Sequence, residues 1–221
     1  MKTLYETGFF LEPAQKQGMG GSVIGGIHNL VGSVSPNSGR ALVQLASIRV
    51  DAGAVACKAW GFPDVPLLYS WTCAICEGRF TYKYLGYGID ILKYIPGEAY
   101  SDFPYEAYPD AFDQIAVNLI PLTQQQQRAI ISINNPDSLD SSPQFSYLAV
   151  PRHQIGGIPY FIPASPSNST CPCCGEKMSF FASIGDDTFS DPRGFAGNEF
   201  VQLIYEICVA CKVVSVDNFC D

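Results

Sequence analysis

Apolar residues recur at every second position in several short segments of the chain. In residues 79–85, aromatic side chains alternate with other types, which is the period of a strand with one buried face. Further short segments are rich in aromatic and β-branched residues and are bounded by turns that contain glycine or proline. This pattern predicts strands over residues 41–50, 66–75, 79–87, 178–184, 199–208 and 212–217.

The middle of the chain favours helix. Thr123-x-x-Gln126 has the form of a capping box with Thr123 as the N-cap. The sequence that follows is compatible with a helix until Asn134-Asn135-Pro136 stops it. We expect a second short helix over residues 110–119. The region is also acidic, because residues 94–140 hold seven acidic residues and a single basic one, Arg128.

Three groups of residues occur twice in the same order. Residues 24–27 (IGGI) recur as 155–158, and residues 46–48 (ASI) recur as 182–184. The third group is Leu68-Tyr69 followed by Cys73-x-x-Cys76, which recurs as Ile204-Tyr205 followed by Cys208-x-x-Cys211. The offset between partners drifts only from 131 to 136. The shared order predicts an internal duplication, with related halves over about 20–90 and 150–217.

The change of five residues in the offset is expected to arise at one segment of the chain. The second half has CPCCG at 171–175, whereas the first half has SPNSG at 35–39, so we expect a cysteine knuckle in the second half alone. The predicted fold class is α+β and mostly β: two related β-rich halves joined by an acidic, partly helical insert. The predicted boundaries, within one compact domain, are 1–93 for the first half, 94–149 for the insert and 150–221 for the second half.

Composition and charge narrow the classes of function. The chain has 221 residues, of which 47% are hydrophobic and nine are cysteine. The net charge of −8 argues against a nucleic-acid ligand, because proteins that bind nucleic acid need a basic face. No apolar run approaches the roughly 20 residues of a membrane span, and we find no signal peptide. We therefore expect a cytoplasmic protein whose cysteines are thiols or metal ligands.

Two cysteine pairs have the spacing of a zinc site. Cys171-x-x-Cys174 and Cys208-x-x-Cys211 each place two thiolates on one tight turn, and together they would supply the four soft ligands that tetrahedral zinc takes. We predict a structural zinc ion at these four residues. In one alternative, Cys173 replaces Cys171 or Cys174 as a ligand. In another, the cysteines bind no metal and pack as small buried hydrophobes.

The pair Cys73-x-x-Cys76 is harder to interpret. It is the counterpart of Cys208 and Cys211 in the repeat, but the first half has no second cysteine pair. We favour a relic, or a pair buried in a strand, over half of a second metal site with Cys57 as a third ligand. Cys220 is expected to be a free thiol.

The order of motifs in the second half resembles that of a known family. Residues 156–161 (GGIPYF), 171–175 (CPCCG), 178–184 (MSFFASI) and 201–211 (VQLIYEICVAC) are similar to the bacterial YwqG-like domain of unknown function. They resemble the programmed cell death protein 2 family more distantly. The chain departs from the pattern at residues 181–183, where the glutamine of the family strand is absent, and in the first half, which lacks the first cysteine pair.

The resemblance implies a duplicated, mostly β fold that carries structural metal in some members. The eukaryotic relatives act as chaperones for a ribosomal protein, and the bacterial relatives are not known as enzymes. These motifs inform the fold far more than the function.

The acidic insert is a candidate partner-binding surface. Carboxylates can steer a basic partner, and aromatic side chains can anchor it. In the alternative interpretation, the insert is a solvated loop that covers a sheet edge, with its aromatic residues in the core. The candidate carboxylates are Glu98, Asp102, Glu106, Asp110 and Asp113, interleaved with Tyr100, Phe103, Tyr105, Tyr108 and Phe112.

We expect a non-enzymatic protein-binding module, because the chain has two histidines and none of the HExxH, GxSxG, GxxxxGK[ST] or GxGxxG motifs. The first prediction is a bacterial immunity protein that sequesters a basic toxin. The second is a chaperone-like binder of a basic ribosomal protein. The third is a zinc-dependent enzyme, for which Asp186-Asp187 is a candidate carboxylate pair.

Overall fold

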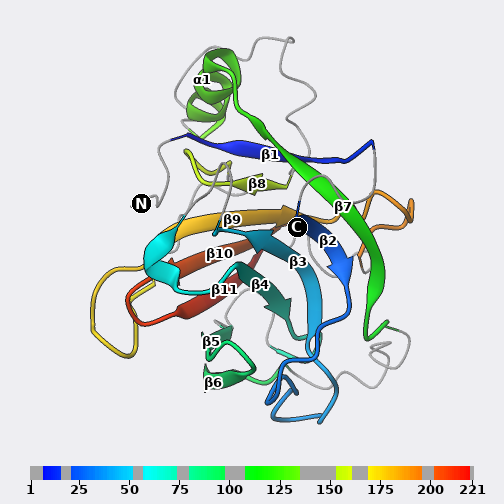
Figure 1. Cartoon of the computed structure of the whole chain (residues 1–221), viewed down its shortest axis with the longest axis vertical. Coiled ribbons are helices and arrows are strands. Elements are labelled where there is room, and N and C mark those ends of the chain that lie inside the picture. Colours follow the sequence, from blue (N-terminus) through cyan, green and yellow to red (C-terminus); the bar gives the residue numbers. More distant parts are fainter. Residues whose placement is uncertain are drawn as a thin grey trace.

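The computed structural model describes residues 7–15, 21–51, 57–73, 80–97, 108–134, 153–160, 169–195 and 202–219 (Figure 1). These residues form mainly strands, with one α-helix among them. The strands are β1 Phe9–Pro13, β2 Ser22–Gly26, β3 Val43–Arg49, β4 Asp64–Tyr69, β5 Phe80–Tyr84, β6 Ile89–Lys93, β7 Phe112–Pro121, β8 Gln154–Ile155, β9 Ser179–Gly185, β10 Gln202–Cys208 and β11 Val213–Phe219; the α-helix is α1 Gln124–Ile133, and a 3₁₀ turn, η1, spans Lys58–Trp60.

All eleven strands belong to one sheet. Their order is β4-β3-β2-β7-β1-β8-β9-β10-β11-β5-β6, and each pair of neighbours runs antiparallel. The sheet curls, so that β4 and β5, which are far apart in the strand order, lie on the same side of the molecule (Figure 1). The prediction of a mostly β fold is confirmed, and each of the six predicted strands is present, as β3, β4, β5, β9, β10 and β11.

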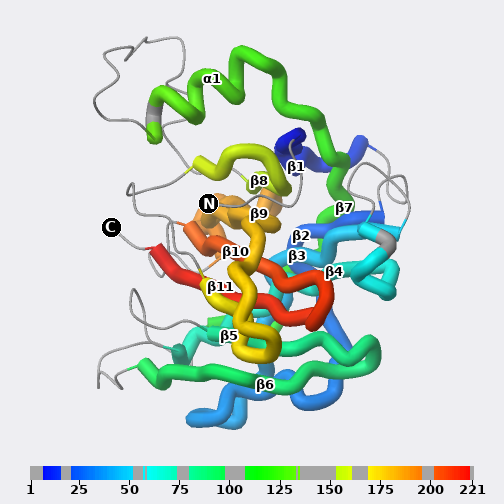
Figure 2. The backbone as a smooth tube through the Cα atoms, turned by 90° about the vertical axis from the view of Figure 1, so that its left-hand side faces the viewer, coloured from blue at the N-terminus to red at the C-terminus, as the bar shows by residue number. Residues whose placement is uncertain are grey.

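The helix α1 begins where the capping box predicts. The Thr123 hydroxyl accepts a hydrogen bond from the Gln126 backbone N–H, and the Gln126 side chain accepts one from the Thr123 backbone N–H, 2.8 Å away. Asn134 is the C-cap, as the sequence predicts. The helix lies at one end of the molecule, beside β1 (Figures 1 and 2). There its buried face packs in a small cluster of Phe10, Leu122, Ala129, Ile130 and Tyr160.

The prediction of a second helix over residues 110–119 is wrong. This segment forms most of β7, which lies in the middle of the sheet and pairs with β1 on one side and β2 on the other. Its apolar residues fit both periods: Phe112, Ile115 and Leu119 have helical spacing, whereas Ile115, Val117 and Leu119 alternate as in a strand. Pairing with two neighbouring strands decides the outcome, because tertiary contacts override local preference.

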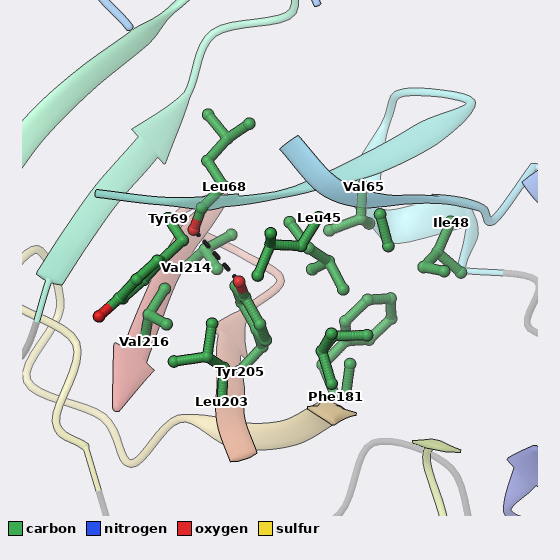
Figure 3. Packing of buried hydrophobic residues seen from close by; sticks show 14 of the residues in the cluster. Leu45, Ile48, Val65, Leu68, Tyr69, Phe181, Leu203, Tyr205, Val214 and Val216 are labelled. Carbon is green, nitrogen blue, oxygen red and sulfur yellow. Dashed lines mark hydrogen bonds between the residues drawn. The ribbon is translucent and has the colours of Figure 1, made fainter. Parts of the chain in front are cut away.

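The curled sheet encloses one main core. Buried side chains come from the whole sheet, from β4 and β3 at one end of the strand order to β5 and β6 at the other. Leu45 of β3, Phe181 of β9 and Tyr205 of β10 are among them (Figure 3). These three side chains are 0% exposed. The main core therefore packs strands from the two ends of the sheet against each other.

The free edge of β4 is closed by tyrosine hydroxyls from across the core. The Tyr82 hydroxyl accepts a hydrogen bond from the Leu68 backbone N–H at 3.1 Å and donates one to the Pro66 carbonyl at 2.6 Å. The Tyr205 hydroxyl donates to the Leu68 carbonyl at 3.3 Å, a bond visible in Figure 3. Backbone groups that would otherwise be buried without a partner are thereby satisfied.

The segments that follow the two edge strands also meet. Cys73, beyond β4, forms an isolated antiparallel bridge with Pro96, beyond β6. The Gly97 N–H donates to the Thr72 carbonyl at 2.9 Å. These contacts bring the two edges of the sheet together at one end of the molecule.

Two hairpins, residues 33–42 and 169–178, have the same backbone bonds. In each, the tenth residue donates to the first, the third to the eighth, and the seventh to the third, at 2.7–2.9 Å. Each has a glycine with positive φ at the seventh position, Gly39 at 69° and Gly175 at 75°. The expected five-residue difference between the halves therefore does not fall here. It lies between the paired glycines and these hairpins, in residues 27–33 against 158–169.

The strands before and after the hairpins also correspond. Ile24 pairs with Ala46, and Ile155 pairs with Ala182. Both β3 and β9 carry an irregularity in pairing with the next strand, at Leu45 and Phe181, residues that are 136 positions apart. The two regions share register as well as local sequence.

Among the residues that the structure describes, no helix is long and apolar enough to cross a membrane.

Tyr82→Phe should lower the free energy of unfolding by about 1–3 kcal/mol, because it leaves the Leu68 N–H and the Pro66 carbonyl buried without their partner. Urea denaturation measures the change. The matched control is Tyr87→Phe, which removes the same atom from a side chain that is 71% exposed and should leave stability unchanged. Equal stability of the two variants would show that the Tyr82 hydroxyl does not close this edge.

Candidate metal centre

The four predicted zinc ligands lie together. The Sγ atoms of Cys171, Cys174, Cys208 and Cys211 are all within 4.8 Å of one another, and those of Cys174 and Cys208 are 3.7 Å apart. Four sulfurs at about 2.3 Å from a tetrahedral zinc ion would be about 3.8 Å from one another. The cluster could therefore hold a metal ion such as zinc.

Two tight turns bring the cysteine pairs to this point. Cys171 and Cys174 lie on the hairpin 169–178, and Cys208 ends β10 while Cys211 follows it. The residue after each pair has positive φ, 75° at Gly175 and 60° at Lys212. A left-handed conformation costs a non-glycine residue about 1 kcal/mol. The Lys212 ammonium lies 4.4 Å from the centroid of the Phe62 ring, a favourable cation–π contact that offsets part of this cost.

Backbone donors polarise the sulfur atoms unequally. Burial raises the pKa of the Cys171 thiol, whereas hydrogen bonds from the N–H groups of Cys173 and Cys174 lower it. The hydrogen bonds outweigh burial, so the net shift of this pKa is downward. Burial raises the pKa of the Cys208 thiol. The pKa of the Cys211 thiol is also raised, first by its hydrogen bond with Cys174 and second by burial. The charge of one thiolate at this position disfavours ionisation of the other three thiols, whereas a bound divalent cation would favour the thiolate form of all four.

The surroundings of the cluster separate the alternatives for these cysteines. Cys171 is buried and packs with Met178 and Val213. Cys174 is exposed, so a purely hydrophobic packing role does not suit it. Cys173 is also exposed and is not a member of the close group of sulfurs. The ligand set with x-x spacing is the one that the structure brings together.

A buried carboxylate fixes the knuckle hairpin to β10. Glu206 is 1% exposed, and its Oε2 accepts the Ser169 N–H at 2.9 Å. The Ser169 carbonyl in turn accepts the Met178 N–H, which closes the hairpin that carries Cys171. Because Glu206 lies two residues before Cys208 on the same strand, this bond sets the position of one cysteine pair relative to the other.

The first-half cysteines do not join a comparable group. Cys73 is 1% exposed and lies in the main core, Cys57 is half-buried against it, and Cys76 and Cys220 lie outside the described residues. Within the described ranges, neither Cys57 nor Cys73 belongs to a group with metal-binding spacing. The location of Cys73 agrees with the prediction that it is buried.

The predicted acidic surface is only partly described. Glu98, Asp102 and Glu106 lie outside the described residues. Asp110 is exposed and forms an ion pair of 2.9 Å with Arg40, and Asp113 is exposed at the start of β7.

The described aromatic residues of the insert face inward. Tyr108 stacks on Trp71 with ring centroids 5.1 Å apart, and Phe112 meets Phe195 edge-on at 4.8 Å. Both pack against the main core. For these two residues the alternative interpretation, in which the aromatics belong to the core, describes their location.

The consecutive carboxylates at 186 and 187 serve their own loop. Asp186 accepts the Phe195 N–H at 2.9 Å, and Asp187 accepts the Phe189 N–H at 2.7 Å. Each carboxylate is thus a backbone acceptor at the end of β9. Neither contact is characteristic of a catalytic pair.

A second candidate surface was not predicted from the sequence. Five large apolar side chains on two adjacent loops are 39–77% exposed; the loops meet where Val31 bridges Gly88. The only sequence signal is the absence of Asp, Glu, Lys and Arg from residues 21–39 and 85–89. We call this set the apolar loop surface: Ile27, Val31, Val34, Leu85 and Tyr87.

No protein-family model, curated protein or solved structure matches the chain.

Protein purified without chelator should contain about one equivalent of zinc. Cys208→Ser should remove most of it and lower the free energy of unfolding by more than about 3 kcal/mol, because metal binding and folding are coupled. Cys73→Ser should retain the metal. Elemental analysis and urea denaturation measure both effects. Less than a few tenths of an equivalent in the native protein would overturn the site, and equal losses in both variants would make Cys73 a ligand.

Glu206→Ala should weaken metal binding by about 10–100-fold, the usual cost of losing a group that orients ligands. Glu206→Gln keeps an oxygen that can accept the Ser169 N–H and should recover most of the affinity. Competition with a chromogenic chelator gives both constants. If the two variants bind metal equally well, the carboxylate does not position the cysteine pairs.

Proposed function

We propose that the chain is a non-enzymatic protein-binding module whose fold is stabilised by one structural zinc ion. The closeness of four sulfur atoms supports the structural role. A complete set of four thiolates leaves no coordination position open for water or substrate, whereas catalytic zinc keeps one open. A zinc-dependent enzyme, the third expectation, is correspondingly disfavoured.

The observation that carries the binding role is the apolar loop surface. Tyr87 is 71% exposed, Ile27 77% and Val31 66%. The Val31 N–H donates to the Tyr87 carbonyl at 3.1 Å, which joins the two loops. Exposed large apolar side chains on neighbouring loops can form an interaction site, and large anchoring side chains supply most of the binding energy. This surface takes over the anchoring role that the sequence assigned to the aromatic residues of the insert.

Two exposed carboxylates lie near the loops that carry this surface. Asp113 lies on β7 where its backbone contacts Gly25, two residues before Ile27, and Asp90 follows the loop that carries Tyr87. Exposed carboxylates at the rim of an apolar patch favour a basic partner by raising the association rate. We therefore keep a basic protein as the partner, with Glu98, Asp102, Glu106, Asp110 and Asp113 as the acidic contribution.

A bacterial immunity protein that sequesters a basic toxin remains our first proposal, because the motifs of the second half resemble the bacterial family more closely than the eukaryotic one. A chaperone for a basic ribosomal protein is the second. Both roles need an acidic protein with an exposed binding surface, and the identity of the partner separates them. We propose a cytoplasmic location for either role.

We also propose that the two β-rich parts arose by internal duplication. Four observations support this: the recurring sequence groups, the Ile24–Ala46 and Ile155–Ala182 pairings, the irregularities at Leu45 and Phe181, and the identical backbone bonds of the two hairpins. The chance of independent origin falls with each feature that recurs in the same order along the chain.

A photoreactive amino acid at position 87 should cross-link to a basic protein in the native cell. The same group at Arg128, which is exposed on α1 at the other end of the molecule, should not. With the partner identified, Val31→Asp and Tyr87→Asp should each weaken binding at least about tenfold, and Asp113→Asn should slow association at low salt only. Equal cross-linking from both positions, or unchanged affinity, would remove this surface from the interface.

A further inference from the structure

A cluster of hydroxyl groups lies where the first hairpin meets the ends of β4 and β6. The Ser35 and Ser70 Oγ atoms are 2.6 Å apart, and those of Ser70 and Thr72 are joined at 3.2 Å. Ser35, Ser70 and Thr72 are all buried. The side chains of Asn37 and Ser38 complete the cluster through bonds to Thr72 of 2.8 and 3.3 Å.

Three residues of the cluster correspond in position to three of the four cysteines, and Thr72, rather than Cys73, is the counterpart of Cys208. Ser35, Ser38 and Thr72 precede Cys171, Cys174 and Cys208 by 136 positions each. The hairpins that carry the first two residues of each set share their backbone bonds. The side-chain contacts correspond too: Ser38 Oγ lies 3.3 Å from Thr72 Oγ1, and Cys174 Sγ lies 3.7 Å from Cys208 Sγ.

The Tyr94 hydroxyl lies among these groups. It is 2.7 Å from Thr72 Oγ1, 3.1 Å from Ser70 Oγ and 2.9 Å from Asn37 Oδ1, and it also interacts with Ser35. Burial raises the pKa of Tyr94, so the hydroxyl keeps its proton and can donate. Two residues earlier, Leu92 packs against the hydrophobic cluster of Cys171, Met178 and Val213, so the β6 segment lies beside both hairpins.

We propose that this hydroxyl cluster is the first half's counterpart of the metal centre, with the Tyr94 hydroxyl in the place of the ion. The inference rests on the proposed zinc site and on the proposed duplication. Serine and threonine hydroxyls stay protonated and are poor zinc ligands, whereas cysteine thiolates are good ones. Hydrogen bonds to a neutral phenol therefore replace coordination bonds, and the first hairpin needs no metal.

This arrangement has a consequence for binding. Val34, on the first hairpin, belongs to the apolar loop surface, and it bridges Ala41 within that hairpin. The part of this surface that lies on the metal-independent hairpin persists when the metal is lost. Removal of metal should therefore loosen one hairpin and leave the other in place.

Hydrogen exchange of the native protein, with and without a strong chelator, tests this on matched amides. On chelation, the N–H groups of Cys171, Gly175 and Met178 should lose much more protection than those of Ser35, Gly39 and Leu42, which make the equivalent bonds and should lose only what the drop in global stability removes. Equal loss of protection at both hairpins would overturn the inference. If neither hairpin responds and no metal is present, the proposed zinc site fails instead.

Restoring the thiols tests the correspondence directly. The native protein should bind about one equivalent of Co(II) with thiolate-to-cobalt charge-transfer absorption. Ser35→Cys, Ser38→Cys and Thr72→Cys combined with Tyr94→Ala should raise this to about two. The same three cysteines with Tyr94 retained should stay at about one, because the phenol still fills the position. A folded quadruple variant that binds one equivalent would overturn the correspondence; if that variant does not fold, the exchange experiment on the native chain decides.

Discussion

Hydrogen bonding at the two edges of the curled sheet is the constraint on which the rest of the structure depends. Burying the edge of β4 against the core removes its backbone groups from water, so each needs an internal partner. The Tyr82 and Tyr205 hydroxyls supply partners for Pro66 and Leu68. The contacts of Thr72 and Cys73 with residues 96–97 then join the segments beyond β4 and β6. This closure brings the first hairpin, β4 and Tyr94 to one place.

The two hairpins solve one structural problem with different chemistry. Each hairpin must be held against the end of a neighbouring strand. At each contact, at least three polar or sulfur atoms from the hairpin and the strand end lie close together. In the second hairpin the convergent atoms are thiols within 4.8 Å of one another, which a divalent ion would bind. In the first they are hydroxyls bonded to one another and to Tyr94. On this account, metal dependence is a local property of one hairpin, and the other hairpin carries Val34 of the apolar loop surface.

Sequence reasoning could predict features that depend on local pattern. The capping box at Thr123 and the strands with alternating aromatic residues form as predicted. The x-x spacing is local and brings together the two members of each cysteine pair, whereas the two pairs meet through the contact of the hairpin 169–178 with β10. It could not predict β7, because Phe112 and its neighbours fit two periods and pairing with β1 and β2 decides between them. The apolar loop surface was missed for the same reason: the exposure of Tyr87 depends on how distant loops meet. The serines of the first hairpin carry no chemical motif, and only their contacts identify them.

The central claim is that four thiolates form a closed, structural zinc centre in a protein that binds rather than catalyses. X-ray absorption at the zinc edge tests it most directly. The zinc ion should have four sulfur atoms at about 2.3 Å and no nitrogen or oxygen in its first coordination shell. A shell with three sulfurs and one oxygen would contradict it, because the open position would point to catalytic zinc.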